Sequence, residues 1–391
     1  MASLSYSKRG EWQELIIALN KNIIFVNPND LQIYKEVTIP EDLTKCDIIQ
    51  IESHADDDPQ PNTKSKSTPI EPPTIQHVQL SSNGCILAVT TSGQKALLLY
   101  QCRPEHAKLV SIRSLARASS AINFTANDKQ LLVTDKTGDC YVFDCENYQL
   151  PGKLILGHLS VVYDVLLTPD DKYVITCDRD DKIRVSNFPN CHEIEGYCLG
   201  HKEFVSAIKL LPFDDKILLS ISGDESLKLW NYRDGTKLCD FKLPAPGIKC
   251  ALRQVNETTC QLAVLLYQPN ESIAEYEITK NTAGVCHIKE LSRHCFDSII
   301  VSGICYVAEK LYIVGIKNDR FVIDIANGGG DKSDDSSKVL AMITEYFQNE
   351  APKPDDVSGW FRKQFDNVTE YYERKKRRIE EKTSKQDDDT V

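Results

Sequence analysis

Hydrophobic and polar positions alternate in short runs through most of the chain, with turn-forming residues between the runs. The segment from Val161 to Asn187 shows the pattern clearly in its runs "VVYDVLL", "YVITC" and "KIRVSN". Runs of this length that are rich in Val, Ile and Tyr are typical of β-strands. The intervening "TPDDK" combines Pro and Asp, which favour tight turns. The pattern predicts a chain made mainly of short β-strands.

Two segments of the chain repeat this pattern almost end to end. "GHLSVVYDVLLTPDDKYVITCDRDDKIRVSN" begins at Gly157 and "GHKEFVSAIKLLPFDDKILLSISGDESLKLWN" begins at Gly200, 43 residues later. This period is that of a four-stranded propeller blade, about 40 to 45 residues. Weaker copies lie at residues 12–34, 77–100, 121–144, 250–278 and 300–325. Seven units predict an all-β fold, a seven-bladed WD40 β-propeller with a C-terminal helical extension.

The segments outside these units lack apolar periodicity. "SHADDDPQPNTKSKSTPIEPP" and "NGGGDKSDDSS" are rich in polar residues, Pro or Gly, a composition typical of disordered segments and linkers. We predict a first blade in 1–52, a disordered insertion in 53–75, the remaining blades in 76–326, a flexible linker in 327–337, a helical extension in 338–380 and a disordered acidic tail in 381–391.

The helical extension is predicted from a stripe of apolar residues. Phe361, Phe365, Val368 and Tyr372 recur at i, i+4, i+7 and i+11, and Ser358 is available as the N-cap. Basic residues follow this stripe, and they are candidates for a contact with tRNA or with a nuclear import receptor. These residues are Arg374, Lys375, Lys376, Arg377 and Arg378.

Charge and cysteine content restrict the class of protein. The formal net charge of −11 argues against nucleic-acid binding by the propeller surface, because such binding depends on Lys and Arg contacts to phosphate. The 14 cysteines form no CxxC pair, and most lie in apolar runs, which favours free thiols in a reducing compartment. We find neither an apolar signal segment nor a membrane span, and expect a cytosolic or nuclear protein.

Motifs of catalysis are missing from the sequence. It contains no GxxxxGK[ST], HExxH or GxSxG motif, and no glycine-rich turn between a strand and a helix. We therefore predict no catalytic residue, no metal site and no cofactor bound by this chain.

Two histidines of the repeats are predicted to be structural. A Gly-His pair opens each of the two strong units, and in propellers such an imidazole pairs with an Asp in the turn before the third strand. We expect His158 to pair with Asp180 and His201 to pair with Asp224, since buried polar groups need partners. Trp230 is the structural tryptophan of the same unit.

The turn "DRDDKIRVSN" carries charges that its counterpart in the next unit lacks. We interpret these charges as additions that the fold does not require, standing on one rim of the propeller. A solvated surface turn is the alternative reading, and mixed signs suit a protein partner better than phosphate. The replacements are Arg179 for Gly223, Lys182 for Ser226, Arg184 for Lys228 and Ser186 for Trp230.

The run from Gly157 to Ser206, together with "FDNVTEYYERKKRR" near the end of the chain, resembles the WD-repeat non-catalytic subunit of tRNA (guanine-N(7)-)-methyltransferase, the Wuho family. The resemblance implies a nuclear, and also cytoplasmic, heterodimer. Its catalytic partner would hold S-adenosylmethionine and methylate guanine N7 in the variable loop of tRNA. This chain would stabilise the partner and help to place the tRNA, without contacting a membrane.

The same resemblance implies an interface. In this family the "DRDxKIR" turn faces the catalytic subunit, and Asp181 and Arg184 are expected to form intersubunit ion pairs. Asp181 stands where we associate Glu with the family, so its side chain is one methylene shorter. The implied partner-binding residues are Arg179, Asp180, Asp181, Lys182 and Arg184.

A second hypothesis is a WD40 scaffold or substrate receptor of a cullin-type ubiquitin ligase. Its support is "WNYR" at residues 230–233, which is similar to the WDxR adaptor-binding motif but has Asn231 in place of Asp. A stand-alone enzyme is a third class, and it would require the isolated chain to transfer methyl groups.

Overall fold

The structure of the protein is a computed structural model. It describes residues 2–9, 12–30, 32–50, 71–103, 107–267, 272–296, 298–326, 334–348, 350, 356–361 and 375–376. The chain divides into two units, residues 1–356 and 357–391. The predicted insertion at 53–75 lies outside the described residues up to residue 70, and the tail at 381–391 lies outside them entirely. Within the described part, no helix is long and apolar enough to cross a membrane.

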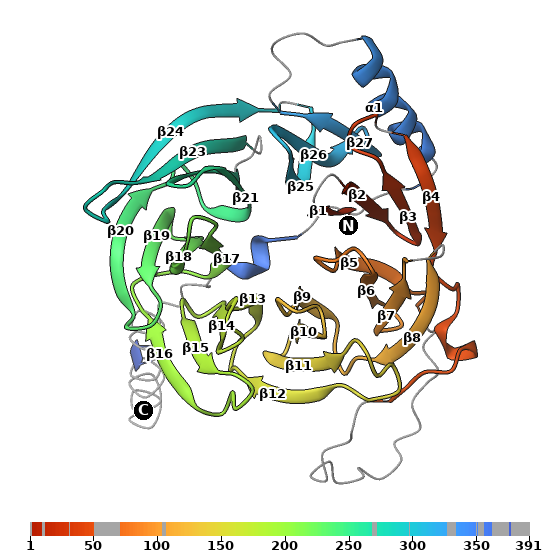
Figure 1. Cartoon of the computed structure of the whole chain (residues 1–391), viewed down its shortest axis with the longest axis horizontal. Coiled ribbons are helices and arrows are strands. Elements are labelled where there is room, and N and C mark those ends of the chain that lie inside the picture. The colour runs from red at the N-terminus through yellow and green to blue at the C-terminus, as the bar shows by residue number, and fades with distance from the viewer. Residues whose placement is uncertain are drawn as a thin grey trace, which may run out of the picture. The chain divides into compact units, whose positions relative to one another are not determined.

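Seven antiparallel sheets form a ring in the first unit, which confirms the predicted seven-bladed propeller (Figure 1). Six sheets have four strands and the seventh has three, each in sequence order from the centre outward.

Blade one is β1–β4 (Ala2–Arg9, Trp12–Leu19, Asn22–Val26, Ile33–Thr38), blade two is β5–β8 (Thr74–Leu80, Ile86–Ser92, Ala96–Gln101, Lys108–Ser114), and blade three is β9–β12 (Ser119–Phe124, Gln130–Asp135, Asp139–Asp144, Lys153–Gly157). Blade four is β13–β16 (Val162–Leu167, Tyr173–Asp178, Ile183–Asn187, Ile194–Cys198), blade five is β17–β20 (Val205–Leu211, Asp214–Ser222, Ser226–Asn231, Thr236–Lys242), blade six is β21–β24 (Gly247–Asn256, Thr259–Leu266, Ser272–Lys280, Cys286–Cys295), and blade seven is β25–β27 (Ile300–Val307, Lys310–Lys317, Arg320–Ile325).

Turn chemistry repeats with the blades. The first turn of blades two, three and four places Gly84, Asp128 and Asp171 at φ values of 70°, 58° and 53°. Gly and Asp tolerate this left-handed conformation better than most residues. In blades three and four a threonine hydroxyl at the end of the inner strand, Thr125 or Thr168, donates to a side-chain oxygen two residues later. These local bonds close the turns that the "TPDDK" pattern predicted.

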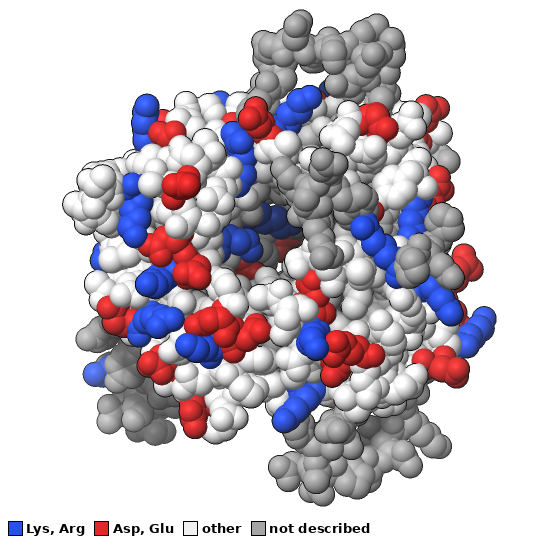
Figure 2. Space-filling view, viewed as in Figure 1, with Lys and Arg blue, Asp and Glu red and all other residues white. Residues whose placement is uncertain are grey.

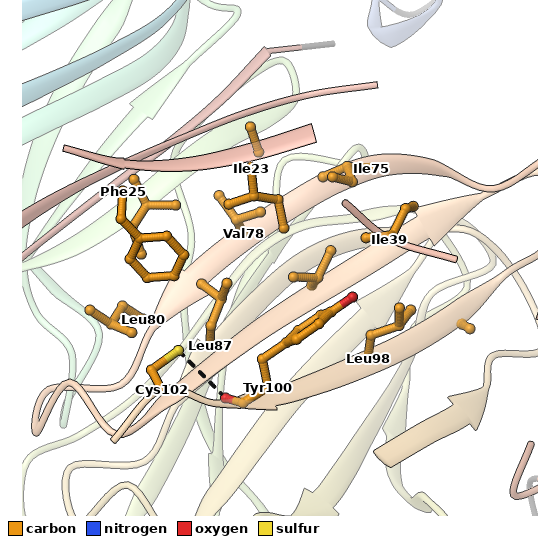
Figure 3. Close-up of a cluster of buried hydrophobic side chains, with 14 of the residues drawn as sticks. Ile23, Phe25, Ile39, Ile75, Val78, Leu80, Leu87, Leu98, Tyr100 and Cys102 are labelled. Carbon is orange, nitrogen blue, oxygen red and sulfur yellow. Dashed lines mark hydrogen bonds between the residues drawn. The ribbon is translucent and has the colours of Figure 1, made fainter. Parts of the chain in front are cut away.

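Apolar side chains from neighbouring blades pack together and hold the ring. Between blades one and two, Ile23 and Phe25 of β3 meet Val78, Leu87 and other buried residues of blade two (Figure 3). Comparable clusters fill the space between the other blades. The fourteen cysteines are all free and most are buried or half-buried, as expected from their apolar surroundings.

The ring closes between blade seven and blade one. Their inner strands, β25 and β1, are in contact, although no strand passes from one sheet to the other. Helix α1 (Asp334–Tyr346) follows β27 and lies at the outer side of these two blades (Figure 1). Leu340, Ile343 and Phe347 are buried in a cluster that contains side chains of both blades. The helix therefore completes the three-stranded blade and bridges the closure.

Polar contacts fix the same junction. The Glu350 carboxylate accepts hydrogen bonds from the side-chain amides of Asn20 and Asn22, at 2.5 and 2.9 Å, on the turn between β2 and β3. The Tyr346 hydroxyl donates to Glu36 of β4 at 3.0 Å. Tyr346 and Glu350, which follow the last blade in sequence, thus form hydrogen bonds with blade one. The ring is therefore closed at its outer side as well as at its centre.

The structure corrects two predictions for the C-terminal region. Residues 334–337 belong to α1 and not to a linker, and the helical period of Leu340, Ile343 and Phe347 is the sequence signal that would have shown it. Ser358 is the first residue of the short 3-10 helix η2 (Ser358–Trp360), whose N-cap position is Val357, and Phe361 follows in an extended conformation. The other members of the predicted stripe lie outside the described residues. A second 3-10 helix, η1 (Leu43–Lys45), lies between β4 and β5.

We predict that Phe347→Ala lowers the free energy of unfolding by about 3 to 5 kcal/mol, because it removes a fully buried ring that packs edge-on against Phe321 at 4.9 Å. Urea denaturation of the intact chain measures the effect. Met342→Ala, on the exposed side of α1, is the matched control and should change stability little. Equal stabilities of wild type and Phe347→Ala would show that α1 does not support the ring.

Candidate functional site

A buried hydrogen-bond chain organises blade five. Trp230 donates from Nε1 to Ser220 Oγ at 2.8 Å, and Ser220 Oγ lies 2.8 Å from His201 Nε2. His201 Nδ1 lies 3.1 Å from an Asp224 carboxylate oxygen, which confirms the predicted pair. Since a carboxylate only accepts, Nδ1 carries the proton and the Ser220 hydroxyl donates to Nε2. The chain joins the Gly-His loop to the turn between β18 and β19.

The protonation states of this pair follow from burial and hydrogen bonding. Burial lowers the pKa of His201, although the nearby Asp224 opposes the shift. Burial works against the charged form of Asp224, but its hydrogen bonds with His201 and Ser226 and from the backbone N–H of Lys202 outweigh burial and lower its pKa. We assign a neutral imidazole beside an ionised carboxylate, which matches the direction of every bond in the chain.

Blade four contains a related network with a different acid. His158 Nδ1 lies 3.0 Å from Asp178, and Nε2 lies 2.8 Å from the Thr176 hydroxyl. The prediction that Asp180 is the partner was wrong. Asp178 ends strand β14, and its second carboxylate oxygen accepts from the backbone N–H groups of Asp180 and Lys182. The Asp178 carboxylate therefore both closes the turn and holds His158. A residue-by-residue alignment with blade five does not reveal this, because it pairs Asp180 with Asp224.

Arg184 lies in strand β15 of blade four and its side chain is mostly buried, so its expected intersubunit ion pair stays a prediction. Its exposed fraction is 9%. Its guanidinium donates to Ser186 Oγ at 2.9 Å, to the Gly157 carbonyl at 3.0 Å and to the Cys191 carbonyl at 2.9 Å. These three bonds hold the guanidinium within the blade.

The neighbouring blade explains why an arginine stands there. Trp230 of blade five corresponds to Ser186, and a Cβ on Gly200 would lie 3.4 Å from the tip of its ring. In blade four, Arg184 reaches from Ser186 to the equivalent glycine, Gly157. Arg184 thus takes over the bridge that tryptophan makes in blade five, using hydrogen bonds instead of ring packing.

A second exchange between the blades shapes the rim. The backbone N–H groups of Arg179 and Gly223 donate to the carbonyls of Val161 and Phe204, both at 2.9 Å, so these positions correspond. A Cβ on Gly223 would lie 2.3 Å from the Phe204 ring, and blade five therefore requires glycine. Blade four has the smaller Val161, which leaves room for a side chain. The size of the residue at position 161 or 204 therefore decides whether this turn position can carry a side chain.

The remaining residues of the charged turn lie at one end of blade four. Arg179 and Lys182 are exposed, and Asp180 and Asp181 are half-buried. Asp181 adopts φ 66°, a conformation that Glu225 shares at the same position in blade five. The backbone bond to Val161 ties this turn to the Gly-His loop. Four of the five predicted partner-binding residues therefore gather on one face.

The basic C-terminal residues are described only in part. Lys375 and Lys376 are helical and exposed, whereas Arg374, Arg377 and Arg378 lie outside the described residues. Their assignment to tRNA or to an import receptor stays a prediction.

Comparison with known proteins identifies the family. The family model of the tRNA methyltransferase TRM82 WD40 domain matches residues 35–151 and 144–309. Relatives named tRNA (guanine-N(7)-)-methyltransferase non-catalytic subunit wuho are 45% identical in Drosophila mojavensis, 43% in Drosophila grimshawi and 40% in Drosophila melanogaster, each alignment covering 94% of this chain and 96% of the relative. The chain belongs to this family. The resemblance of the two central blades to the Wuho family is confirmed.

A solved structure supports the fold alone. A chain in the crystal structure of the mitotic checkpoint complex superposes with a TM-score of 0.60 at 11% sequence identity, covering 82% of this chain and 85% of that chain. The family's members are named as non-catalytic subunits, which agrees with the missing catalytic motifs of the sequence.

We predict that Arg184→Ala lowers the free energy of unfolding by about 2 kcal/mol or more, because buried acceptors lose their donor. Chemical denaturation of the purified chain measures the change. Lys182→Ala, on the exposed part of the same turn, is the control and should be near neutral. Full stability of Arg184→Ala would contradict the bridging role.

The pKa of His201 predicts acid sensitivity. Its folded pKa lies below the ordinary 6.5, so the unfolded chain binds the proton more tightly. Its contribution to stability is complete above pH 6.5 and is lost as pH falls toward the folded pKa, by at most about 1.4 kcal/mol per pH unit. Between pH 6.5 and about 4.5, unfolding measurements should show a smaller slope for His201→Gln than for wild type. His192→Gln, at an exposed site, should keep the wild-type slope, and identical slopes in all three proteins would refute the assignment.

Proposed function

We propose that this chain binds and stabilises the catalytic subunit of a tRNA (guanine-N7)-methyltransferase, which forms N7-methylguanine in the variable loop of tRNA. The observation that carries the proposal is the charged turn of blade four, presented on one face of a propeller whose family consists of non-catalytic subunits of this enzyme. The chain acts through binding, and its partner carries out the reaction.

The charges of the turn favour a protein over phosphate as the direct contact. Residues 179–182 carry two positive and two negative side chains in close succession. Positive and negative side chains are also intermixed on the face shown in Figure 2, and the whole chain has a net charge of −11. Mixed signs set the register of a complementary protein surface, whereas phosphate binding needs a basic surface.

Rigid backbone bonds prepare this turn for binding. Asp178 accepts from two backbone N–H groups of the turn and also holds His158, so the loop and the turn are fixed to each other. Charged side chains on such a turn lose less conformational entropy when a partner binds than those on a mobile loop. The turn is therefore suited to a specific, persistent interface.

The remaining parts of the proposal concern the complex. The catalytic partner would hold S-adenosylmethionine, and this chain would hold no cofactor. The basic segment from Arg374 to Arg378 would contact tRNA in the complex or an import receptor, in keeping with a nuclear and partly cytoplasmic location. Its local positive charge supports either contact, because the propeller itself is acidic.

The ligase hypothesis gains no comparable support. Trp230 is fully buried in the hydrogen-bond chain of blade five. Arg233 lies 3.5 Å from Asp170 and over the Tyr173 ring, both residues of blade four. The "WNYR" segment thus contributes to contacts between blades.

We predict that the double variant Arg179→Glu, Lys182→Glu weakens binding of the catalytic subunit by tens of fold or more, since charge pairs within interfaces are worth about 2 to 5 kcal/mol when one partner is lost. Stimulation of tRNA N7-guanine methylation by the reconstituted pair should fall with it. The readouts are the affinity, the methylation rate and the melting temperature of the free chain, which should not change.

The matched control is Lys216→Glu, an exposed lysine near the start of β18, at the end of blade five opposite the turn between β18 and β19. It reverses one charge, as each substitution of the double variant does, but should leave binding intact. If the wild-type chain neither binds nor stimulates the catalytic subunit, the proposed function is refuted. If the double variant binds as wild type does, another face forms the interface.

A further inference from the structure

Leu159 is a leucine that folding leaves entirely in water. It lies in the loop between β12 and β13, directly after the structural His158, and its exposed fraction is 106%. No other large apolar residue of the described chain is comparably exposed; the next, Leu199, reaches 62%. Such a side chain gains no hydrophobic stabilisation from the folded state.

The propeller scaffold does not require an apolar residue at this position. In blade five the corresponding residue, directly after His201, is Lys202, and it is exposed. Both loops are held in the same way, through a histidine bonded to an acid and a hydroxyl. The difference between Leu159 and Lys202 therefore has no explanation in the folding of the blade.

The backbone that carries Leu159 is firmly placed. The His158 N–H donates to the Gly138 carbonyl of blade three at 2.9 Å, and its imidazole is bonded to Asp178 and Thr176. A Cβ on Gly138 would lie 2.5 Å from the His158 carbonyl oxygen and 2.6 Å from that of Ser160, so the loop rests closely on this glycine. Leu159 is thus presented on a rigid loop, which lowers the entropic cost of burying it in a partner.

The surroundings of Leu159 match those of an interface anchor. The backbone bond between Arg179 and Val161 joins its loop to the charged turn, and Asp178 joins the two again through His158. An apolar side chain on a loop bonded to the turn that carries exposed Arg179 and Lys182 has the arrangement of a binding hot spot, where a buried apolar centre is bordered by polar groups that exclude water.

We propose that Leu159 is the apolar anchor of the interface with the catalytic subunit and enters an apolar pocket of that protein. This inference rests on the proposed function. The partner is assigned to the catalytic subunit because Leu159 is continuous with the charged turn proposed to bind it, and because that turn has mixed charges suited to a protein surface. The charged turn sets the register, and Leu159 supplies hydrophobic affinity.

The test compares the affinity of three full-length variants for the purified catalytic subunit. Leu159→Lys introduces the residue of blade five and should weaken binding roughly 10- to 100-fold, the effect of leaving one leucine unburied. Leu159→Met keeps an apolar side chain, and its affinity should stay within a few fold of the wild-type value. Leu238→Lys, at a 49% exposed leucine on the outer strand β20, is the matched control and should bind as wild type does.

Melting temperatures and sedimentation of the free chains complete the experiment. All variants should melt as wild type does, so a loss of binding cannot reflect unfolding. If Leu159→Lys binds with unchanged affinity, the proposal that Leu159 is an anchor is overturned. This holds even when the double variant Arg179→Glu, Lys182→Glu confirms the interface. A second outcome also overturns the anchor. If the wild-type chain self-associates, and Leu159→Lys abolishes this self-association but leaves heterodimer affinity unchanged, Leu159 contacts a second copy of the chain. A wild-type chain that does not bind the catalytic subunit refutes the proposed function together with the anchor.

Discussion

The contact between blade seven and blade one is the constraint on which the propeller depends, because a ring of sheets packed side by side is held only when its last member meets its first. Inner strands β25 and β1 supply part of this contact. Helix α1 supplies the rest, burying Leu340, Ile343 and Phe347 among side chains of both blades, while Glu350 binds two asparagines of blade one. A helix thus joins the two blades, a role that an exchanged strand could also fill.

Within this closed ring, blades four and five connect the Gly-His loop to their strands with different residues. Blade five uses tryptophan to bridge strand and loop, and its Phe204 ring excludes any side chain at Gly223. Blade four makes the bridge with buried Arg184 and carries a smaller Val161, which admits Arg179 to the rim. The bridge made by Arg184 preserves the scaffold, whereas Val161 in place of Phe204 alters the surface by admitting Arg179. The side chain of Arg179 on the charged turn therefore depends on the small residue at position 161.

The candidate binding face combines this turn with the Gly-His loop that carries Leu159. Asp178 and His158 connect the two segments, so polar and apolar side chains are held by one buried hydrogen-bond network. That arrangement suits a subunit that contributes binding energy and position, while a partner contributes chemistry. It also separates stability from recognition: the histidines, Arg184 and Trp230 maintain the blades, and exposed neighbours one or two positions away are available to the partner.

The sequence alone determined the seven blades, the turns and the His201–Asp224 pair, because strand alternation and turn chemistry are local properties that repeat with each blade. It also placed the charged turn correctly on the rim. The tertiary structure alone decided that Asp178, not Asp180, holds His158, that Arg184 is buried and that α1 closes the ring. These outcomes depend on which side chains meet across strands and blades. Arg179 is exposed on the turn, whereas Arg184 is buried in β15, because the fold brings the carbonyls of Gly157 and Cys191 to its guanidinium.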